Sequence, residues 1–258
     1  MTAILSVERL TLRYIGLVAL ADLSVAFAPG AIHGLIGPNG AGKTTLINAI
    51  SGLATASEGR ILFEGRDIAG LAPHLIAALG IGRTFQNAEV FADHTTLDNA
   101  MVGFYRTMRR GFWHDVLGTP GKRAAEHEMR RRAEALLDRF SVAGYRDAVA
   151  ADLPFGVLKR IDLARALAAR PRVLLLDEPT SGMSANEAQA TITVCRALAQ
   201  EHGVTLIVVE HNMRVIMSLA DTITVLHHGE KIAEGTPEDV QRDPVVIDTY
   251  LGRGAARA

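Results

Sequence analysis

The sequence predicts an α/β fold in which a mainly parallel sheet is accompanied by an antiparallel β layer and an inserted helical part. Apolar runs rich in β-branched residues recur at positions 32–36, 172–176, 205–209 and 222–226. Each run is apolar on both faces, which is typical of parallel strands covered by helices. Helical patterns separate these runs, and the alternation of strands with helices indicates an α/β architecture.

The first 70 residues predict the antiparallel layer. Residues 7–12, 25–28 and 60–64 have the composition of short strands, and Pro-Gly or Glu-Gly pairs bound them. A helix is expected over residues 43–51, where Gly52 ends it. Its predicted buried face consists of Leu46, Ala49, Ile50 and Leu53.

The middle of the chain predicts a helical subdomain over residues 87–170. One helix is expected at 124–140, with a buried face of Ala133, Leu136, Leu137 and Phe140. We therefore expect a single domain over 1–258, in which residues 1–86 and 171–258 form the core with its antiparallel layer.

Capping patterns predict three helix starts in the last third of the chain. Ser184 with Glu187 makes a capping box, and Gly203 ends the helix that follows. Thr236-Pro237 and Asp243-Pro244 each place an N-cap before a proline, which predicts two short helices.

Composition narrows the possible partners and the compartment. The chain of 258 residues has 27 Lys+Arg against 28 Asp+Glu, and this near-neutral balance gives no support to nucleic-acid binding. The one cysteine, Cys195, excludes an intramolecular disulfide, and residues 1–14 lack a secretory signal pattern. Apolar runs fall short of the roughly 18 residues that a membrane span needs. We expect a cytoplasmic protein that works beside a membrane if one is involved.

A phosphate-binding loop follows the apolar run 32–36 and precedes the helix at 43. The segment fits the pattern G-x-x-x-x-G-K-[ST] and predicts the core of a P-loop NTPase. Its glycines let successive backbone N–H groups point at phosphate, Lys43 supplies the counter-charge, and the Thr44 hydroxyl suits Mg²⁺. The predicted nucleotide-binding residues are Gly37, Pro38, Asn39, Gly40, Ala41, Gly42, Lys43, Thr44 and Thr45.

Two adjacent carboxylates end the buried run at 173–176. Alternation along a strand sends Asp177 and Glu178 in different directions. Asp177 can hold Mg²⁺ through water, while Glu178 can orient or deprotonate the attacking water. Together with the phosphate-binding loop, this pair predicts hydrolysis of a nucleoside triphosphate.

Four further motifs stand in an order that resembles the ATP-binding subunits of ABC transporters. Residues 84–87, Thr-Phe-Gln-Asn, resemble the glutamine loop, and 153–165 resemble the signature segment with its helix. Residues 177–180 resemble the Walker B end, and 209–212, Val-Glu-His-Asn, resemble the switch histidine. The resemblance implies the ABC ATPase fold with ATP and Mg²⁺ as ligands. It also implies membrane permeases, a second identical or homologous ATPase and, indirectly, an extracytoplasmic solute-binding protein as partners.

Local features resemble the ATPases of branched-chain amino acid importers, in particular the longer of their two paired subunits. These features are residues 83–86, an extra loop at 103–121 and the ending at 246–252. They imply an ATPase that powers uptake of branched-chain amino acids or a similar small polar solute. Two alternatives stay open, which are a regulatory or weakly hydrolysing partner subunit and a soluble ABC ATPase outside transport.

Roles for single residues follow from the resemblance. Tyr14 matches the aromatic residue that stacks on adenine, although an edge-strand core tyrosine is the alternative. Gln86 matches the residue that approaches Mg²⁺ and the attacking water, and His211, at the end of an apolar strand, matches the γ-phosphate switch. The other histidines are expected at the surface or in turns. The implied catalytic set is Glu178, His211 and Gln86, and the implied metal set is Thr44, Gln86 and Asp177.

The signature segment departs from the family pattern. Leu-Ser-Gly-Gly-Gln is replaced by Leu153-Pro154-Phe155-Gly156-Val157, which lacks the serine hydroxyl and the glutamine amide. The resemblance implies that this segment reaches the partner ATPase's nucleotide, here through backbone N–H groups and the helix dipole. The loop 181–184 also lacks the usual aspartate. Basic residues gather around 106–132 and are explained either by a permease or lipid contact or by a solvated helix face.

Overall fold

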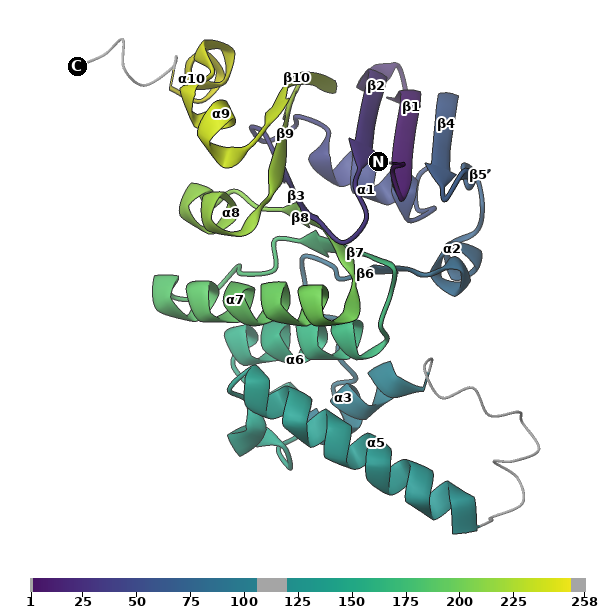
Figure 1. Cartoon of the computed structure of the whole chain (residues 1–258), viewed down its shortest axis with the longest axis vertical. Coiled ribbons are helices and arrows are strands. Elements are labelled where there is room, and N and C mark those ends of the chain that lie inside the picture. The colour runs from purple at the N-terminus through teal and green to yellow at the C-terminus, as the bar shows by residue number, and fades with distance from the viewer. Residues whose placement is uncertain (1, 106–119, 252–258) are drawn as a thin grey trace. The chain divides into compact units, whose positions relative to one another are not determined.

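A computed structural model of the chain describes residues 2–105 and 120–251. Contacts divide the chain into two compact units (Figure 1). The core unit comprises Met1–Arg83, Arg172–Glu178 and Ala199–Ala258, and the helical unit comprises Thr84–Pro171 and Pro179–Leu198. Of the features expected from the sequence, the arginines at 106–110 and most of the loop 103–121 lie outside the described residues. Within the described ranges, no helix is both long and apolar enough to span a membrane.

A six-stranded sheet forms the centre of the core unit, in the order β10-β9-β3-β8-β7-β6. Neighbouring strands from β9 to β6 are parallel, and β10 runs antiparallel to β9. The apolar runs of the sequence form four of these strands, as predicted, whereas β6 and β10 were not predicted. The strands are β3 (Ile32–Ile36), β6 (Ile81–Arg83), β7 (Val173–Asp177), β8 (Thr205–Val209), β9 (Thr222–His227) and β10 (Glu230–Gly235).

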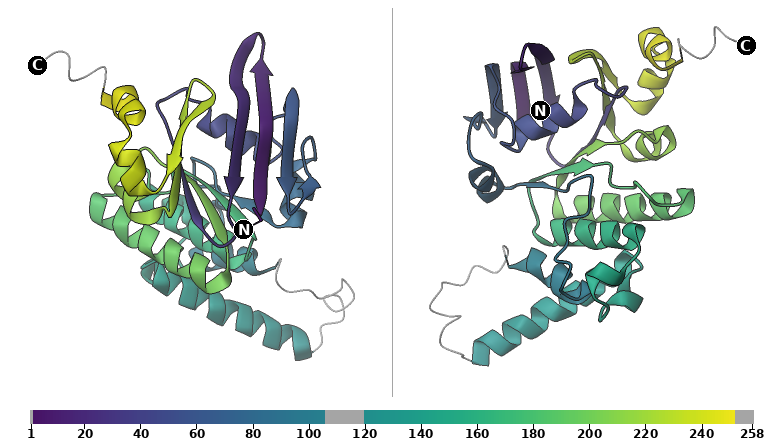
Figure 2. Two further views of the ribbon diagram at one scale, coloured as in Figure 1. Left: turned by 45° about the horizontal axis from the view of Figure 1, so that its top comes forward. Right: turned by 180° about the vertical axis from the view of Figure 1, so that it is seen from behind.

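The predicted antiparallel layer is a four-stranded sheet in the order β2-β1-β4-β5 (Figure 2). Its strands are β1 (Leu5–Tyr14), β2 (Leu17–Phe27), β4 (Glu58–Phe63) and β5 (Arg66–Asp67). β1 and β2 are longer than the apolar pattern indicated because their register shifts interrupt the alternation. They form a hairpin whose tight turn has Ile15 and Gly16 at positive φ.

Helix α1 (Lys43–Ile50) joins the two sheets of the core unit through one apolar cluster. Leu46, Ala49 and Ile50 are buried as predicted, and Ile47 is buried with them. The prediction for Leu53 was wrong, since its side chain is 51% exposed. The helix ends at Ile50, and Gly52 has φ +76°, so the helical period does not continue to Leu53.

One histidine was also predicted wrongly. His33 lies inside β3 and is buried, where its Nε2 accepts a hydrogen bond of 2.9 Å from the Ala28 N–H. Burial lowers its pKa, which favours the neutral ring that accepts this bond. The expectation of a surface position overlooked the fully buried strand around this residue.

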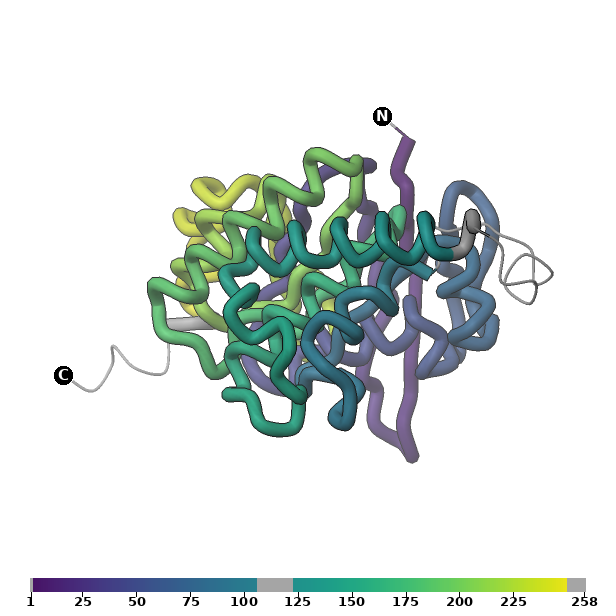
Figure 3. The backbone as a smooth tube through the Cα atoms, turned by 90° about the horizontal axis from the view of Figure 1, so that it is seen from below, coloured from purple at the N-terminus to yellow at the C-terminus, as the bar shows by residue number. Residues whose placement is uncertain are grey.

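The helical unit contains α3 (Thr96–Phe104), α5 (Pro120–Arg139), α6 (Phe155–Ala168), two 3₁₀ turns (Ala143–Tyr145 and Ala150–Asp152) and the first part of α7 (Ala185–His202). Helix α3 packs on both α5 and α6 (Figure 3). The expected face of α5 is buried, with Ala133, Leu136, Leu137 and Phe140 each at most 8% exposed. This apolar stripe supports α5 on its neighbours.

Capping explains the ends of several helices. Ser184 and Glu187 exchange hydrogen bonds before α7, and Thr236 and Asp239 form a capping box, so both predictions are confirmed. Asp243 likewise accepts a bond from the Val245 N–H at the start of the last helix. The remaining helices are α2 (Pro73–Leu79), α8 (Met213–Leu219), α9 (Pro237–Arg242) and α10 (Pro244–Leu251).

Candidate nucleotide site

The predicted phosphate loop connects β3 to α1, and its shape depends on glycine. Gly42 precedes the helix with φ +100°, a left-handed conformation. A Cβ atom there would lie 2.7 Å from Leu20 Cδ2 and 2.9 Å from the Ala19 carbonyl oxygen. Only glycine fits this position without displacing β2, and the helix N-terminus that follows is a site for anions.

Lys43 provides the positive charge of the loop. Its Nζ donates to the carbonyl oxygens of Gly37, at 2.7 Å, and Pro38, at 2.9 Å. Burial lowers the pKa of Lys43, and the nearby carboxylates of Glu178 and Asp177 oppose that shift. The ammonium is therefore held above the loop among groups that stabilise its charge.

A cavity of about 420 Å³ lies in front of this loop. The side chains of Tyr14, Leu17 and Val18 form its apolar wall, on the β1–β2 hairpin. Tyr14 is 46% exposed, which does not fit a core tyrosine. An aromatic ring beside a phosphate loop suits a nucleobase, and the stacking role of Tyr14 stays a prediction. The wall of the cavity on the side of the phosphate loop consists of Asn39, Gly40, Ala41, Gly42, Lys43, Thr44, Thr45 and Glu178.

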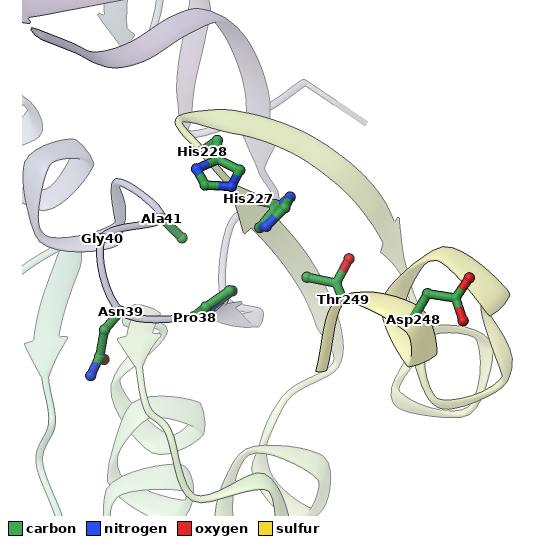
Figure 4. A pocket seen from close by; sticks show the side chains of 8 residues that line it. All are labelled: Pro38, Asn39, Gly40, Ala41, His227, His228, Asp248 and Thr249. Carbon is green, nitrogen blue, oxygen red and sulfur yellow. The ribbon is translucent and has the colours of Figure 1, made fainter. Parts of the chain in front are cut away.

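A second cavity, of about 390 Å³, shares Asn39, Gly40 and Ala41 with the first (Figure 4). Helix α10 contributes Asp248 and Thr249, the last residue of β9 contributes His227, and the turn after it contributes His228. Sequence reasoning treated His228 only as a turn residue, yet it lines both cavities. Its position depends on the turn being held against the loop, since the Gly229 N–H donates to the Ala41 carbonyl oxygen at 3.0 Å.

Asp177 ends β7 and is 5% exposed. Its Oδ2 atom lies 3.4 Å from Nη2 of Arg83, at the end of β6. The same guanidinium donates through Nη1 to Asn48 Oδ1 at 2.7 Å and Ser51 Oγ at 2.8 Å, both near the end of α1. Arg83 therefore connects the predicted metal ligand to the helix that follows the phosphate loop. The sequence marked Arg83 only as part of a resemblance, and no local pattern revealed this pair.

Glu178 leaves the strand with φ +48°, so the direction of its side chain comes from a left-handed residue and not from strand alternation alone. Its N–H donates to the Val209 carbonyl oxygen at 2.9 Å, which holds it against the end of β8. Its Oε1 lies 3.6 Å from Nδ1 of His211, whose side chain is 65% exposed. The carboxylate and the imidazole predicted to act in hydrolysis therefore lie side by side at one edge of the sheet.

The remaining predicted residues belong to the helical unit. Gln86 lies two residues beyond the start of that unit, and α6 begins at Phe155 with Pro154 in the N-cap position. Pro154 provides no side-chain cap, but its carbonyl oxygen accepts from the Val157 N–H at 2.9 Å, so the N–H groups of Phe155 and Gly156 are those of a bare helix N-terminus. The structure brings Tyr14, the phosphate loop, Asp177, Glu178 and His211 together within the core unit. The roles of Gln86 and of residues 153–157 stay predictions.

The chain is similar to known proteins along almost its whole length. Residues 20–181 match a family model described as ABC transporter, and residues 230–256 match one described as branched-chain amino acid ATP-binding cassette transporter. The high-affinity branched-chain amino acid transport ATP-binding protein BraF of Pseudomonas aeruginosa is 36% identical and covers 96% of this chain and 98% of its own. The corresponding protein LivG of Escherichia coli is 34% identical with the same coverage.

Solved structures give the same result for the fold. A nucleotide-free ATP-binding cassette from an ABC transporter superposes with a TM-score of 0.81 at 29% identity, covering 97% of this chain and 100% of that one. An ADP-bound cassette superposes with a TM-score of 0.80 at 29% identity, covering 98% and 100%. The predicted ABC ATPase fold is thereby confirmed.

Proposed function

The chain belongs to the ABC transporter family of ATP-binding proteins and is an ATPase subunit, and from this premise we propose that it powers an importer of branched-chain amino acids. Support comes from the relatives, which are named for that transport, and from the match of residues 230–256. We expect other subunits to contact the solute, so the proposal concerns the transport that ATP hydrolysis by this subunit powers.

The observation that carries the hydrolytic part of the proposal is that Lys43 and Glu178 line one cavity and that His211 lies beside Glu178. Lys43 and the loop N–H groups bind the β- and γ-phosphates of ATP. Glu178 accepts a proton from the attacking water, and its fixed backbone holds the carboxylate toward the phosphate loop. His211, beside Glu178, donates a hydrogen bond to the γ-phosphate.

Thr44 lines this cavity and Asp177 directly precedes Glu178, and together they suit Mg²⁺. The Thr44 hydroxyl and the Asp177 carboxylate are hard oxygen ligands of the kind that Mg²⁺ prefers. When bound, the ion would neutralise charge that develops on the phosphate oxygens. Arg83 holds Asp177 in place from the side of α1. We propose Gln86 as a third contact to the ion, brought by the helical unit.

The proposed assembly contains two ATPase chains, membrane permeases and an extracytoplasmic binding protein. Each ATPase offers its α6 N-terminus to the nucleotide of its partner, so the backbone N–H groups of Phe155 and Gly156 replace the missing serine and glutamine side chains. The subunit then works on the cytoplasmic side of the membrane, where its helical unit meets the permeases.

Two variants test the hydrolytic role. Lys43→Ala removes the phosphate counter-charge and is expected to abolish ATP binding, whereas Glu178→Gln keeps binding and lowers kcat by at least about a hundredfold. ATP affinity and phosphate release are measured separately. Lys231→Met, which removes a cation on β10 paired with Glu234, is the control and should change neither quantity.

Two results would contradict parts of the proposal. Unchanged phosphate release by Glu178→Gln would show that Glu178 is not the base. Slow hydrolysis by the unmodified chain, in the presence of its permeases and a second ATPase, would favour the regulatory subunit instead. Uptake of labelled leucine by vesicles that hold the complete complex tests the solute, with urea and short amides as competitors.

A further inference from the structure

Lys159 is a charged residue in the interior of the helical unit. It lies on α6, one turn beyond the altered signature segment, and is only 1% exposed. Its Nζ donates a hydrogen bond of 2.9 Å to the carbonyl oxygen of Phe85. Phe85 directly precedes Gln86, so a buried charge connects the signature helix to the backbone of the glutamine loop. Burying an ammonium is unfavourable unless polar partners fix it, which makes this connection specific in geometry.

The same ammonium also faces the signature segment itself. Nζ lies 5.8 Å from the centroid of the Phe155 ring, within the range of a cation–π interaction. Phe155 stands where the family pattern has a glycine, so the ring that Lys159 faces is one of the departures of this chain.

Phe155 in turn contacts the loop that follows the Walker B end. Gly182 in this loop has φ +75°, and a Cβ atom there would lie 2.6 Å from Phe155 Cδ1. The first turn of α6 lies against the same loop, because a Cβ atom on Gly156 would be 3.6 Å from the Gly182 carbonyl oxygen. Phe85, Lys159, Phe155 and Gly182 therefore form one continuous chain of contacts within the helical unit, which we call the Lys159 joint.

We propose that the Lys159 joint transmits the position of the glutamine loop to the signature segment and to the loop 181–184. The proposal deepens the proposed function and rests on it, since the glutamine loop responds to ATP only if ATP is bound. Lys159 and Phe155 act as positioning residues through their side chains, because neither side chain is assigned a contact with nucleotide. In this chain the Lys159 joint connects the altered signature segment to the glutamine loop and to the loop 181–184.

The surroundings of Lys159 explain why such a connection is stiff. Asp162, one turn along α6, is buried and pairs with Arg165 at 2.7 Å, and its carboxylate also attracts Lys159. Arg165 lies over the Phe91 ring at 5.8 Å, so the segment after the glutamine loop is held to the same helix. A shift of the Phe85 carbonyl oxygen therefore moves the Lys159 ammonium, which is fixed on α6. Because this ammonium is buried, water cannot replace the carbonyl oxygen as its partner.

Hydrogen exchange in the full chain tests the joint. On the Glu178→Gln background with Mg-ATP, we expect slower exchange at amides 85–87, at 155–158 and at 181–183. Lys159→Met, which keeps the length of the side chain and removes the charge, should keep the ATP-dependent change at 85–87 and lose it at the other two segments. Lys159→Arg should restore it, and Lys231→Met is the neutral control.

A merely structural lysine would give a different result. Its loss would speed exchange equally with and without ATP, and would leave the ATP-dependent difference intact at 155–158 and 181–183. That outcome would overturn the proposal, as would an unmodified chain that responds to ATP at 85–87 alone. A chain that binds no ATP would instead contradict the proposed function and is recognised from the binding measurement.

A second variant keeps the test decisive if Lys159→Met does not fold. Phe155→Leu preserves an apolar contact with Gly182 and removes the ring face that Lys159 meets. We expect ATP affinity to stay unchanged and kcat, measured without the Glu178 substitution, to fall by about three- to tenfold, the scale of one lost interaction of this kind. Equal kcat values for this variant and the unmodified chain would overturn the role of Phe155.

Discussion

Replacing Arg83 by methionine should destabilise the core unit strongly, because Arg83 is the buried cation beside Asp177. The two side chains are 8% and 7% exposed, and the guanidinium also bonds to Asn48 and Ser51. Removing one partner of a buried ion pair costs about 3–5 kcal/mol. The 3.4 Å between Nη2 of Arg83 and Oδ2 of Asp177 is long for an ion pair, which lowers the expected loss. Asn48 Oδ1 and Ser51 Oγ would each lose a hydrogen-bond donor, which raises it. We therefore expect a loss of about 4 kcal/mol in the free energy of unfolding.

Urea unfolding followed by circular dichroism measures this loss, as a lower midpoint at an unchanged slope. A matched control is Arg60→Met, since Arg60 pairs with Glu8 at a similar distance of 3.6 Å but both side chains are exposed, at 66% and 45%. An exposed pair contributes at most about 1 kcal/mol. An Arg83→Met variant whose stability lies within about 1 kcal/mol of the control would refute the idea that burial makes this pair important.

Three further predictions concern single sites. Burial raises the pKa of Asp162 to about 6, although the charge of Arg165 lowers it. The free energy of unfolding should therefore fall as pH rises from about 4 to 6 and then stay constant. Asp162→Asn should reduce this pH dependence in urea titrations. Gly42→Ala should abolish ATP binding in a filter assay, whereas Gly65→Ala, where φ is also positive but the space is open, should cost only about 1 kcal/mol and leave binding intact. Burial raises the pKa of Cys195 to about 12, so a thiol reagent should label it only as fast as the protein unfolds, and rapid labelling of the native chain would contradict this.

Local patterns were sufficient for the phosphate loop and for most strands. The loop depends on glycine conformations and on one lysine within a few residues, and β3 and β8 begin and end where the apolar runs do. Capping by Ser184 and Thr236 was equally local, because an N-cap and its partner are three residues apart. Such features follow from chain geometry over one or two turns, which the sequence displays directly.

Interactions between distant segments were decided only by the tertiary structure. β6 has three residues and exists through its pairing with β7, about 90 positions along the chain, and the same pairing brings Arg83 to Asp177. Lys159 reaches Phe85 across 74 positions, and nothing in an amphipathic helix pattern distinguishes a lysine that is buried from one that is solvated. The sequence by itself predicted which groups bind phosphate and act in its hydrolysis. The packing of sheets and helices decided that Arg83 lies beside Asp177 and that Lys159 is bonded to Phe85. Burial and pairing of these charges depend on segments that meet only after folding.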